Sequence, residues 1–264
     1  MNNNFNSKSS QTNSKPFLKI SNLYKSYGKT KVFEKFNLEI KHNDRIALLG
    51  VNGSGKSTLI EIILGLRNKN SGRIEYSKNF KTFLRNLQVV FQIGKYPNNM
   101  RVSHLVSFYR DFYAQTYPPK MITRLVELLE LKLLWKQKVN KLSFGQQKKL
   151  EALLMFMIDC DFYIIDELTA GVDINTRVKI FALFQNLLKK NPHKGMIWIT
   201  HDSDEIEKLC NRIVILSKNN LNIVFDGSLK DVKIKFKSVK NMVLEHLRIE
   251  VKDEIKVSDI DIKF

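Results

Sequence analysis

Cysteine is scarce in this chain, which has two among 264 residues. Cys160 and Cys210 lie far apart and belong to no Cys-x-x-Cys motif or Cys/His cluster. This argues against a disulfide framework or a zinc site and fits a reducing compartment. With 43% hydrophobic residues, the chain can still bury one large core or two small ones.

Long hydrophobic runs are also missing. The most apolar stretches, residues 59–66 and 150–158, are about half as long as the roughly 20 residues that span a bilayer. Residues 1–15 are polar and lack the apolar segment of a secretory signal, so we expect a disordered tail there. These absences predict a soluble protein, or one held at a membrane only through a partner.

Acidic residues are few relative to basic ones: 26 Asp and Glu stand against 44 Lys and Arg, a formal net charge of +18. Such a charge favours nucleic acid or an anionic membrane as a partner. Biased composition is the alternative, because the basic residues are spread along the chain and form no Arg-rich block with interleaved aromatics. We favour this second explanation and still expect some attraction to anionic lipid.

Predicted strands and helices alternate after the polar tail, as judged from the spacing of apolar residues. The predicted strands are 17–28, 31–40, 45–50, 87–92, 160–166, 195–200 and 212–217. The predicted helices are 59–66, 102–113, 118–136, 175–190 and 203–210. In the helix at 102–113, Leu105, Phe108 and Phe112 share one face.

The alternation predicts an α/β fold: a mostly parallel sheet covered by helices, an N-terminal antiparallel β subdomain and an inserted α-helical subdomain at about 93–140. We expect the main domain to span 16–230. The role of the extension at 231–264 is not indicated by its sequence. Its first part could be a basic helix or strand, and 249–264 alternates like a pair of edge strands.

A glycine-rich motif follows the strand predicted at 45–50. The stretch "GVNGSGKST" matches G-x-x-x-x-G-K-[ST] between a buried strand and a helix, the context in which this pattern binds nucleotide phosphates. Its glycines let backbone N–H groups close around phosphate oxygens, and the helix that begins near Lys56 points its positive end at them. Lys56 would contact the β- and γ-phosphates, and the Ser57 hydroxyl can hold Mg²⁺. The predicted nucleotide-binding residues are Gly50, Asn52, Gly53, Ser54, Gly55, Lys56, Ser57 and Thr58.

Two adjacent carboxylates end the apolar stretch "FYIIDE", residues 162–167. Asp166, at the strand end, is positioned for the Mg²⁺ shell, and Glu167 can polarise an attacking water. Alone, such a strand end could equally be an ordinary loop cap. Downstream of a phosphate-binding loop, nucleotide hydrolysis is the better explanation.

The order and spacing of these motifs over about residues 17–228 resemble the ATP-binding cassette family. The stretch "LSFGQ", residues 142–146, is similar to the Leu-Ser-Gly-Gly-Gln signature of that family. In the family, two cassettes pair head to tail, and each signature helix points its N-terminus at the nucleotide of the other. The resemblance therefore assigns Ser143, Gly145 and Gln146 to ATP on a second subunit. Phe144 replaces the usual Gly, which is tolerable if Ser143 and Gly145 make the phosphate contacts, although it puts the hydrolysis rate in doubt.

The same resemblance assigns further residues. Tyr27 matches the aromatic that stacks on adenine, and Gln92 matches the glutamine that contacts Mg²⁺ and the attacking water. Asp173 ends "LTAGVD", which is similar to a Pro-Thr-Ser-Gly-Leu-Asp loop that reaches across the dimer, although Leu and Ala replace its Pro and Ser. His201 matches the histidine that hydrogen-bonds the γ-phosphate. The implied catalytic residues are Glu167, His201 and Gln92, and the implied Mg²⁺ ligands are Ser57, Gln92 and Asp166.

The resemblance implies an ATP-hydrolysing subunit that dimerises around two ATP and powers a separate transmembrane permease from the cytoplasmic face of the membrane. The second subunit would be a copy of this chain or a related chain. The short insertion between Gln92 and the signature is similar to that of single-cassette exporters. The alternatives are a soluble ATPase of the same family that acts on nucleic acid or ribosomes, and a catalytically inactive partner. We expect no specific nucleic acid, since no charged linker or long coiled coil is present.

Overall fold

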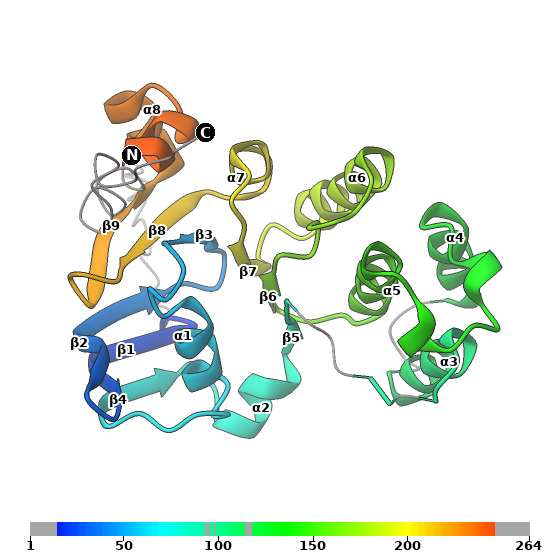
Figure 1. Cartoon of the computed structure of the whole chain (residues 1–264), viewed down its shortest axis with the longest axis horizontal. Helices are drawn as coiled ribbons and strands as arrows, with labels where there is room; N and C mark the ends of the chain where they lie inside the picture. Colours follow the sequence, from blue (N-terminus) through cyan, green and yellow to red (C-terminus); the bar gives the residue numbers. More distant parts are fainter. Residues whose placement is uncertain (1–14, 93–95, 98, 114–117, 246–264) are drawn as a thin grey trace, which may run out of the picture.

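A computed structural model describes residues 15–92, 96–97, 99–113 and 118–245. At the N-terminal end, three strands form an antiparallel sheet in the order β2-β1-β4 (Figure 1). Their bounds are β1 Leu18–Tyr27, β2 Thr30–Ile40 and β4 Ser71–Tyr76. The predicted antiparallel β subdomain is therefore confirmed, with β4 as a strand that the apolar pattern did not predict.

The second sheet has the order β5-β6-β7-β3-β8-β9, and its pairs are parallel except for β8 with β9. β3, β6 and β7 are short and almost wholly buried, as continuous apolar runs predict for strands covered on both faces. The predicted mostly parallel sheet is thus confirmed. The bounds are β3 Arg45–Leu49, β5 Leu87–Val90, β6 Phe162–Asp166, β7 Gly195–Ile199, β8 Arg212–Ser217 and β9 Asn222–Ser228.

Alternate residues of the parallel strands face two separate hydrophobic clusters. On one face, Ile46 and Leu48 of β3 pack with helix α1 and the three-stranded sheet. On the other, Ala47 and Leu49 pack with α5, α6 and α7. The helix bounds are α1 Lys56–Ile63, α2 Phe80–Arg85, α5 Phe144–Phe156, α6 Ile174–Lys190 and α7 Ser203–Leu209.

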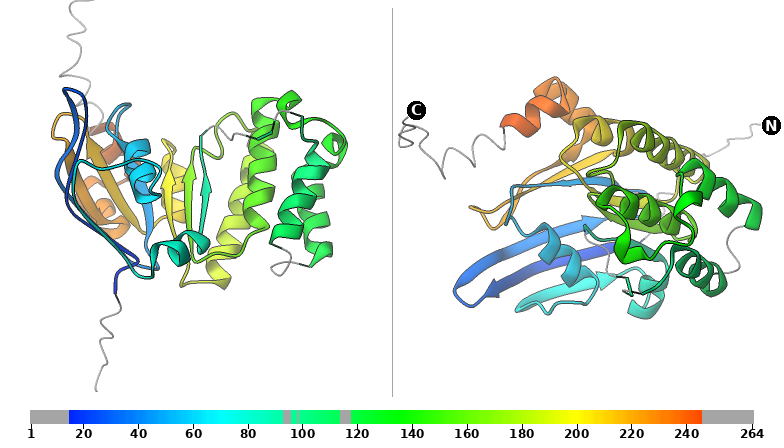
Figure 2. Two further views of the ribbon diagram at one scale, coloured as in Figure 1. Left: turned by 90° about the horizontal axis from the view of Figure 1, so that it is seen from below. Right: turned by 45° about the vertical axis from the view of Figure 1, so that its right-hand side comes forward.

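Helices α3 (Val102–Phe112) and α4 (Pro119–Leu128) lie at the end of the molecule farthest from the three-stranded sheet (Figures 1 and 2). The short 3-10 turns η1 (Lys132–Leu134) and η2 (Val139–Lys141) lead from α4 to α5. Leu105, Phe108 and Phe112, which were expected to share one face of α3, differ in their exposure. Leu105 is buried, whereas Phe108 and Phe112 are 56% and 71% exposed, because α3 packs through Val102, Leu105 and Val106.

The described part of the C-terminal extension packs on the core. Helix α8, Leu229–Phe236, is one of the two forms that its sequence allowed, and Val232, Val239 and Met242 are fully buried. The edge strands predicted at 249–264 and nearly all of the predicted tail at 1–15 lie outside the described residues. The predicted domain boundaries stay predictions. None of the helices in the described part of the chain is long and apolar enough to cross a bilayer.

Candidate functional site

The glycine-rich loop connects β3 to α1 through backbone conformations that favour glycine. Gly50 and Gly55 have φ values of 148° and 98°. A Cβ atom on Gly55 would lie 2.7 Å from the Phe33 ring, and one on Gly50 would lie 2.6 Å from the Leu216 carbonyl oxygen. Because neither space can hold a side chain, the sequence had to place glycine at both positions.

The glycine-rich loop brings a helix N-terminus, a buried hydroxyl and a cation close together. The N-terminus of α1 carries no side-chain cap at Gly55 and no acidic residue in its first turn. The Ser54 hydroxyl is buried and has no hydrogen-bond partner among the described residues. The Lys56 ammonium donates to the carbonyls of Gly50 (2.6 Å) and Val51 (3.1 Å). Lys56 is also the first residue of α1, so this cation lies at the N-terminus of the helix. A helix N-terminus with a cation beside it is a phosphate-binding arrangement.

Three polar side chains meet where β5, β6 and β7 end. Glu167 directly follows β6, and Gln92 and His201 each lie two residues beyond β5 and β7. The Gln92 amide donates to Glu167 Oε2 at 2.7 Å, and His201 Nε2 lies 3.7 Å from Glu167 Oε1. Parallel strands carry their carboxyl ends to one edge of a sheet, so residues distant in sequence converge there.

Asp166, the last residue of β6, lies beside this group. Burial raises the pKa of the Asp166 carboxyl and the neighbouring Glu167 raises it further, while Lys56 and Lys148 act in the opposite direction. Two adjacent carboxylates of this kind favour the approach of a cation.

A pocket of about 350 Å³ joins the glycine-rich loop to the strand ends. Tyr27 lies at its rim, where its hydroxyl is 3.4 Å from Thr58 Oγ1, and the cations of Lys25 and Arg67 lie 4.7 and 5.1 Å from its ring centroid. Val32, which the motifs did not indicate, also lines the pocket. The predicted residues that line it are Tyr27, Asn52, Gly53, Gly55, Lys56, Ser57, Thr58, Gln92, Asp166, Glu167 and His201.

The signature residues lie outside this pocket, at the start of α5. The backbone N–H of Gln146 donates to the Ser143 hydroxyl (3.3 Å), and the backbone N–H of Ser143 donates to Gln146 Oε1 (2.9 Å). These two hydrogen bonds form a capping box. A Cβ on Gly145 would lie 2.7 Å from the Gly171 carbonyl oxygen, so the loop after Glu167 requires glycine at 145. The exposed Phe144 ring packs against Gly171, where an added Cβ atom would lie 2.6 Å from it.

Asp173 also lies outside the pocket and caps α6. Its carboxylate accepts from the backbone N–H and the hydroxyl of Thr176 at 2.9 and 2.8 Å, and Lys149 Nζ is 3.3 Å away. The backbone hydrogen bond from Thr176 is the main reason why the pKa of Asp173 falls to about 2.

A buried polar cluster beside the loop that follows Glu167 was not singled out by any motif. Glu205 of α7 is 1% exposed and bonds Thr169 (2.5 Å), Trp198 Nε1 (2.8 Å) and Arg177 (3.1 Å). It connects the loop after Glu167 to β7, which precedes His201. The sequence did carry a sign of this cluster: in the helix predicted at 203–210, the acidic Glu205 stands on the buried side with Ile206 and Leu209.

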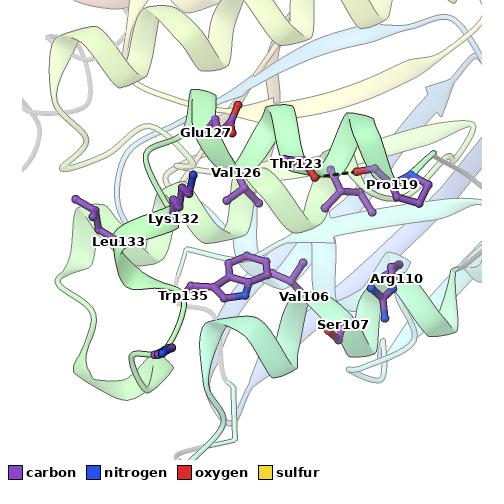
Figure 3. A pocket seen from close by; sticks show the side chains of 12 residues that line it. Val106, Ser107, Arg110, Pro119, Thr123, Val126, Glu127, Lys132, Leu133 and Trp135 are labelled. Atoms are coloured by element: carbon purple, nitrogen blue, oxygen red, sulfur yellow. Dashed lines mark hydrogen bonds between the residues drawn. The ribbon is translucent and has the colours of Figure 1, made fainter.

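A groove of about 660 Å³ lies between α3, α4 and the η1 turn. Figure 3 shows Val106, Val126 and Trp135 along its floor. Three basic side chains line it (Arg110, Lys132 and Lys136) together with the acidic side chain of Glu127. Leu133 beside it is 96% exposed.

A family model described as ABC transporter matches residues 33–170, just over half of the chain. The sulfate/thiosulfate import ATP-binding protein CysA of Yersinia pseudotuberculosis is 27% identical over 217 residues, which are 78% of this chain and 60% of that protein. The same protein of Escherichia coli K12 is 27% identical over 214 residues, 77% of this chain and 58% of that protein. The chain thus spans about 60% of the length of the curated relatives that it matches.

Solved structures share the fold. An ATP-binding subunit of an ABC transporter has a TM-score of 0.70 at 22% identity, over 89% of this chain and 99% of that chain. A bacterial Atm1-family ABC exporter with ATP bound has a TM-score of 0.71 at 17% identity, over 88% of this chain and 42% of that chain. A cbiO1 structure from Clostridium perfringens, part of the ABC transporter complex cbiONQ, has a TM-score of 0.62 at 25% identity, over 91% of this chain and 100% of that chain. These names give no support to the alternative of an ATPase that acts on nucleic acid.

Proposed function

The chain belongs to the ABC transporter family, and we propose that it is an ATP-binding and ATP-hydrolysing subunit that powers a separate membrane permease. The observation that carries hydrolysis is the convergence of Gln92 and His201 on Glu167, at the mouth of the phosphate-binding pocket. Glu167 would accept a proton from the attacking water, and the Gln92 amide would hold its carboxylate in place.

Mg²⁺ and ATP fit the residues that are present. Ser57, Gln92 and Asp166 each offer an oxygen ligand at one pocket, and hard oxygen donors are what Mg²⁺ prefers. The bound ion would neutralise charge on the phosphates. The N-terminus of α1 and Lys56 would hold the phosphates, and the Tyr27 ring would stack on the adenine.

We further propose that the protein works as a dimer around two ATP. Ser143, Gly145, Gln146 and Asp173 lie outside the chain's own pocket, and Ser143 and Phe144 are exposed at the start of α5. A second subunit placed head to tail could receive them. The capping hydrogen bonds of Ser143 and Asp173 leave further acceptor capacity on both side chains.

The groove between α3 and α4 is the surface that we propose for the permease. Its apolar floor suits an apolar helix or loop, and its three basic side chains against one acidic side chain suit acidic residues in that segment. This contact would hold the chain at the cytoplasmic face of a membrane. For direction we propose export, because the insertion before the signature is short, although the curated relatives are named for import.

Two measurements test the proposal. Purified protein should release phosphate from ATP in a Mg²⁺-dependent way. In addition, the chain should co-purify with a co-expressed permease, and Leu133→Asp at the exposed edge of the groove should abolish co-purification while phosphate release in isolation persists. Absence of ATP binding removes the whole proposal. Binding and hydrolysis without any membrane partner removes the transporter role alone.

A further inference from the structure

A buried ion pair lies inside α5, between two residues to which no motif assigns a role. Lys148 and Glu151 are 1% and 3% exposed, and Lys148 Nζ lies 2.9 Å from Glu151 Oε2. Burying two charges costs desolvation that their attraction repays only with good geometry, and apolar replacements are often equally stable. A contribution to stability therefore does not explain why Lys148 and Glu151 are charged.

Lys148 also reaches across to the chain segment that carries Gln92. Its ammonium group donates to the Gln92 carbonyl at 2.7 Å and to the Phe91 carbonyl at 3.4 Å. With Glu151, these acceptors match the three N–H donors of a lysine. The ladder between β5 and β6 ends at Val90, so Lys148 supplies partners for the first carbonyls beyond the sheet.

The two contacts of Gln92 act together. Its backbone carbonyl is held by Lys148, and its side-chain amide reaches Glu167 at 2.7 Å. A residue beyond the end of a strand has no sheet partner to fix its backbone, so the direction of its side chain depends on such a contact. The position of a catalytic group within about 1 Å can change a rate by about 100-fold.

We propose that Lys148 is a positioning residue that acts through Gln92: it fixes the Gln92 backbone so that the Gln92 amide stays on Glu167. Glu151 keeps the Lys148 ammonium in place as its counter-charge. Because Lys148 stands in the second turn of the helix that begins after Ser143, the same contact ties Gln92 to the signature turn. This inference rests on the proposed ATPase function.

The test compares ATP hydrolysis by four proteins: wild type, Lys148→Met/Glu151→Leu, Gln92→Ala, and the triple variant. The double variant removes both charges and keeps apolar volume, so its melting temperature should stay near that of the wild type. We expect its kcat to fall about 10-fold or more while KM for ATP changes less than about two-fold, because neither Lys148 nor Glu151 lines the nucleotide pocket. If Lys148 acts through Gln92, the triple variant should be no slower than Gln92→Ala.

Lys194→Met is the matched control. Lys194 is 4% exposed and likewise bonds a carboxylate, Asp159, and a backbone carbonyl, that of Cys160, but at the opposite ends of β6 and β7. This variant should lower the melting temperature and leave kcat within about three-fold of the wild type. If the double variant does not fold, Lys148→Gln/Glu151→Gln replaces it, since the shorter amide at 148 no longer reaches Gln92.

An unchanged kcat in the double variant, or rate losses that multiply in the triple variant, would overturn the inference. A wild-type protein that hydrolyses no ATP would remove the proposed function and the inference with it. An active wild type whose double variant keeps its rate would remove the inference alone.

Discussion

Glu167→Gln should separate ATP binding from ATP hydrolysis. The substitution keeps the size of the side chain and an oxygen that can accept from Gln92 Nε2, which is now 2.7 Å from the carboxylate. What is lost is the negative charge and the ability to take a proton. Glu167 has a φ of 49°, a conformation that β-branched residues rarely adopt. Gln is unbranched at Cβ, like Glu, so this substitution adds no backbone strain.

The expected magnitude follows from the role of a general base. Removing such a group slows a reaction by about 100- to 10,000-fold, so hydrolysis by Glu167→Gln should be barely detectable. ATP affinity should be equal or higher, because the variant removes one of two adjacent carboxylates beside the phosphates. The neighbouring charge that raises the pKa of Asp166 is removed as well, which favours its ionised form.

Phosphate release under steady-state conditions measures the first effect, and calorimetric titration with ATP measures the second. With Mg²⁺-ATP, the variant should also elute from a sizing column as an ATP-bound dimer, whereas wild type with ADP should elute as a monomer. Asp166→Asn is the comparison, since the loss of a metal ligand should weaken ATP binding itself. Hydrolysis by Glu167→Gln within about three-fold of wild type would refute the reasoning and shift the water-positioning role to Gln92 or His201.

Three further outcomes are expected. Lys56→Ala should weaken ATP binding by about 10- to 100-fold, the effect of losing a charged hydrogen bond; an unchanged calorimetric affinity would contradict the phosphate-site assignment. Ser143→Arg should bind ATP as a monomer but not dimerise on a sizing column, and a variant that still dimerises would exclude the signature from the interface. Asp173→Ala should lower the melting temperature at pH 7 by about 2–4 °C through loss of the α6 cap. Since the pKa of Asp173 is lowered to about 2, its contribution is present above about pH 4 and is lost as pH falls toward 2, so melting curves of the two proteins should converge there.

The parts of the fold that were predicted are those whose signal is local. Continuous apolar runs indicated β3, β6 and β7, and the spacing of Gly50, Gly55 and Lys56 indicated the phosphate loop, because a close backbone turn tolerates little else. β4 and β9 were missed. Their residues are only partly buried, and both exist as strands through pairing with β1 and β8 rather than through their own composition.

Glu167 was predicted from the residue pattern, whereas its proposed partners Gln92 and His201 were predicted from resemblance alone. Neither a glutamine after β5 nor a histidine after β7 carries meaning alone; the parallel order β5-β6-β7 brings both to Glu167. The roles of Ser143 and Asp173 in a second subunit stay predictions. In one chain both side chains cap helices, and that local function would by itself select serine and aspartate at these positions.

Phe144 shows why a departure from a motif needs the structure for its explanation. Its ring packs against Gly171, the Gly145 backbone lies against the Gly171 carbonyl, and Lys148 lies 5.5 Å from the ring centroid while it bonds Gln92. The start of α5 is therefore fixed to the loop after Glu167 on one side and to the Gln92 segment on the other. Lys148 and Gln92 are 56 residues apart in the sequence, so no local pattern could relate them. An aromatic ring here is compatible with the fold because it packs within its own chain and leaves Ser143 exposed beside it.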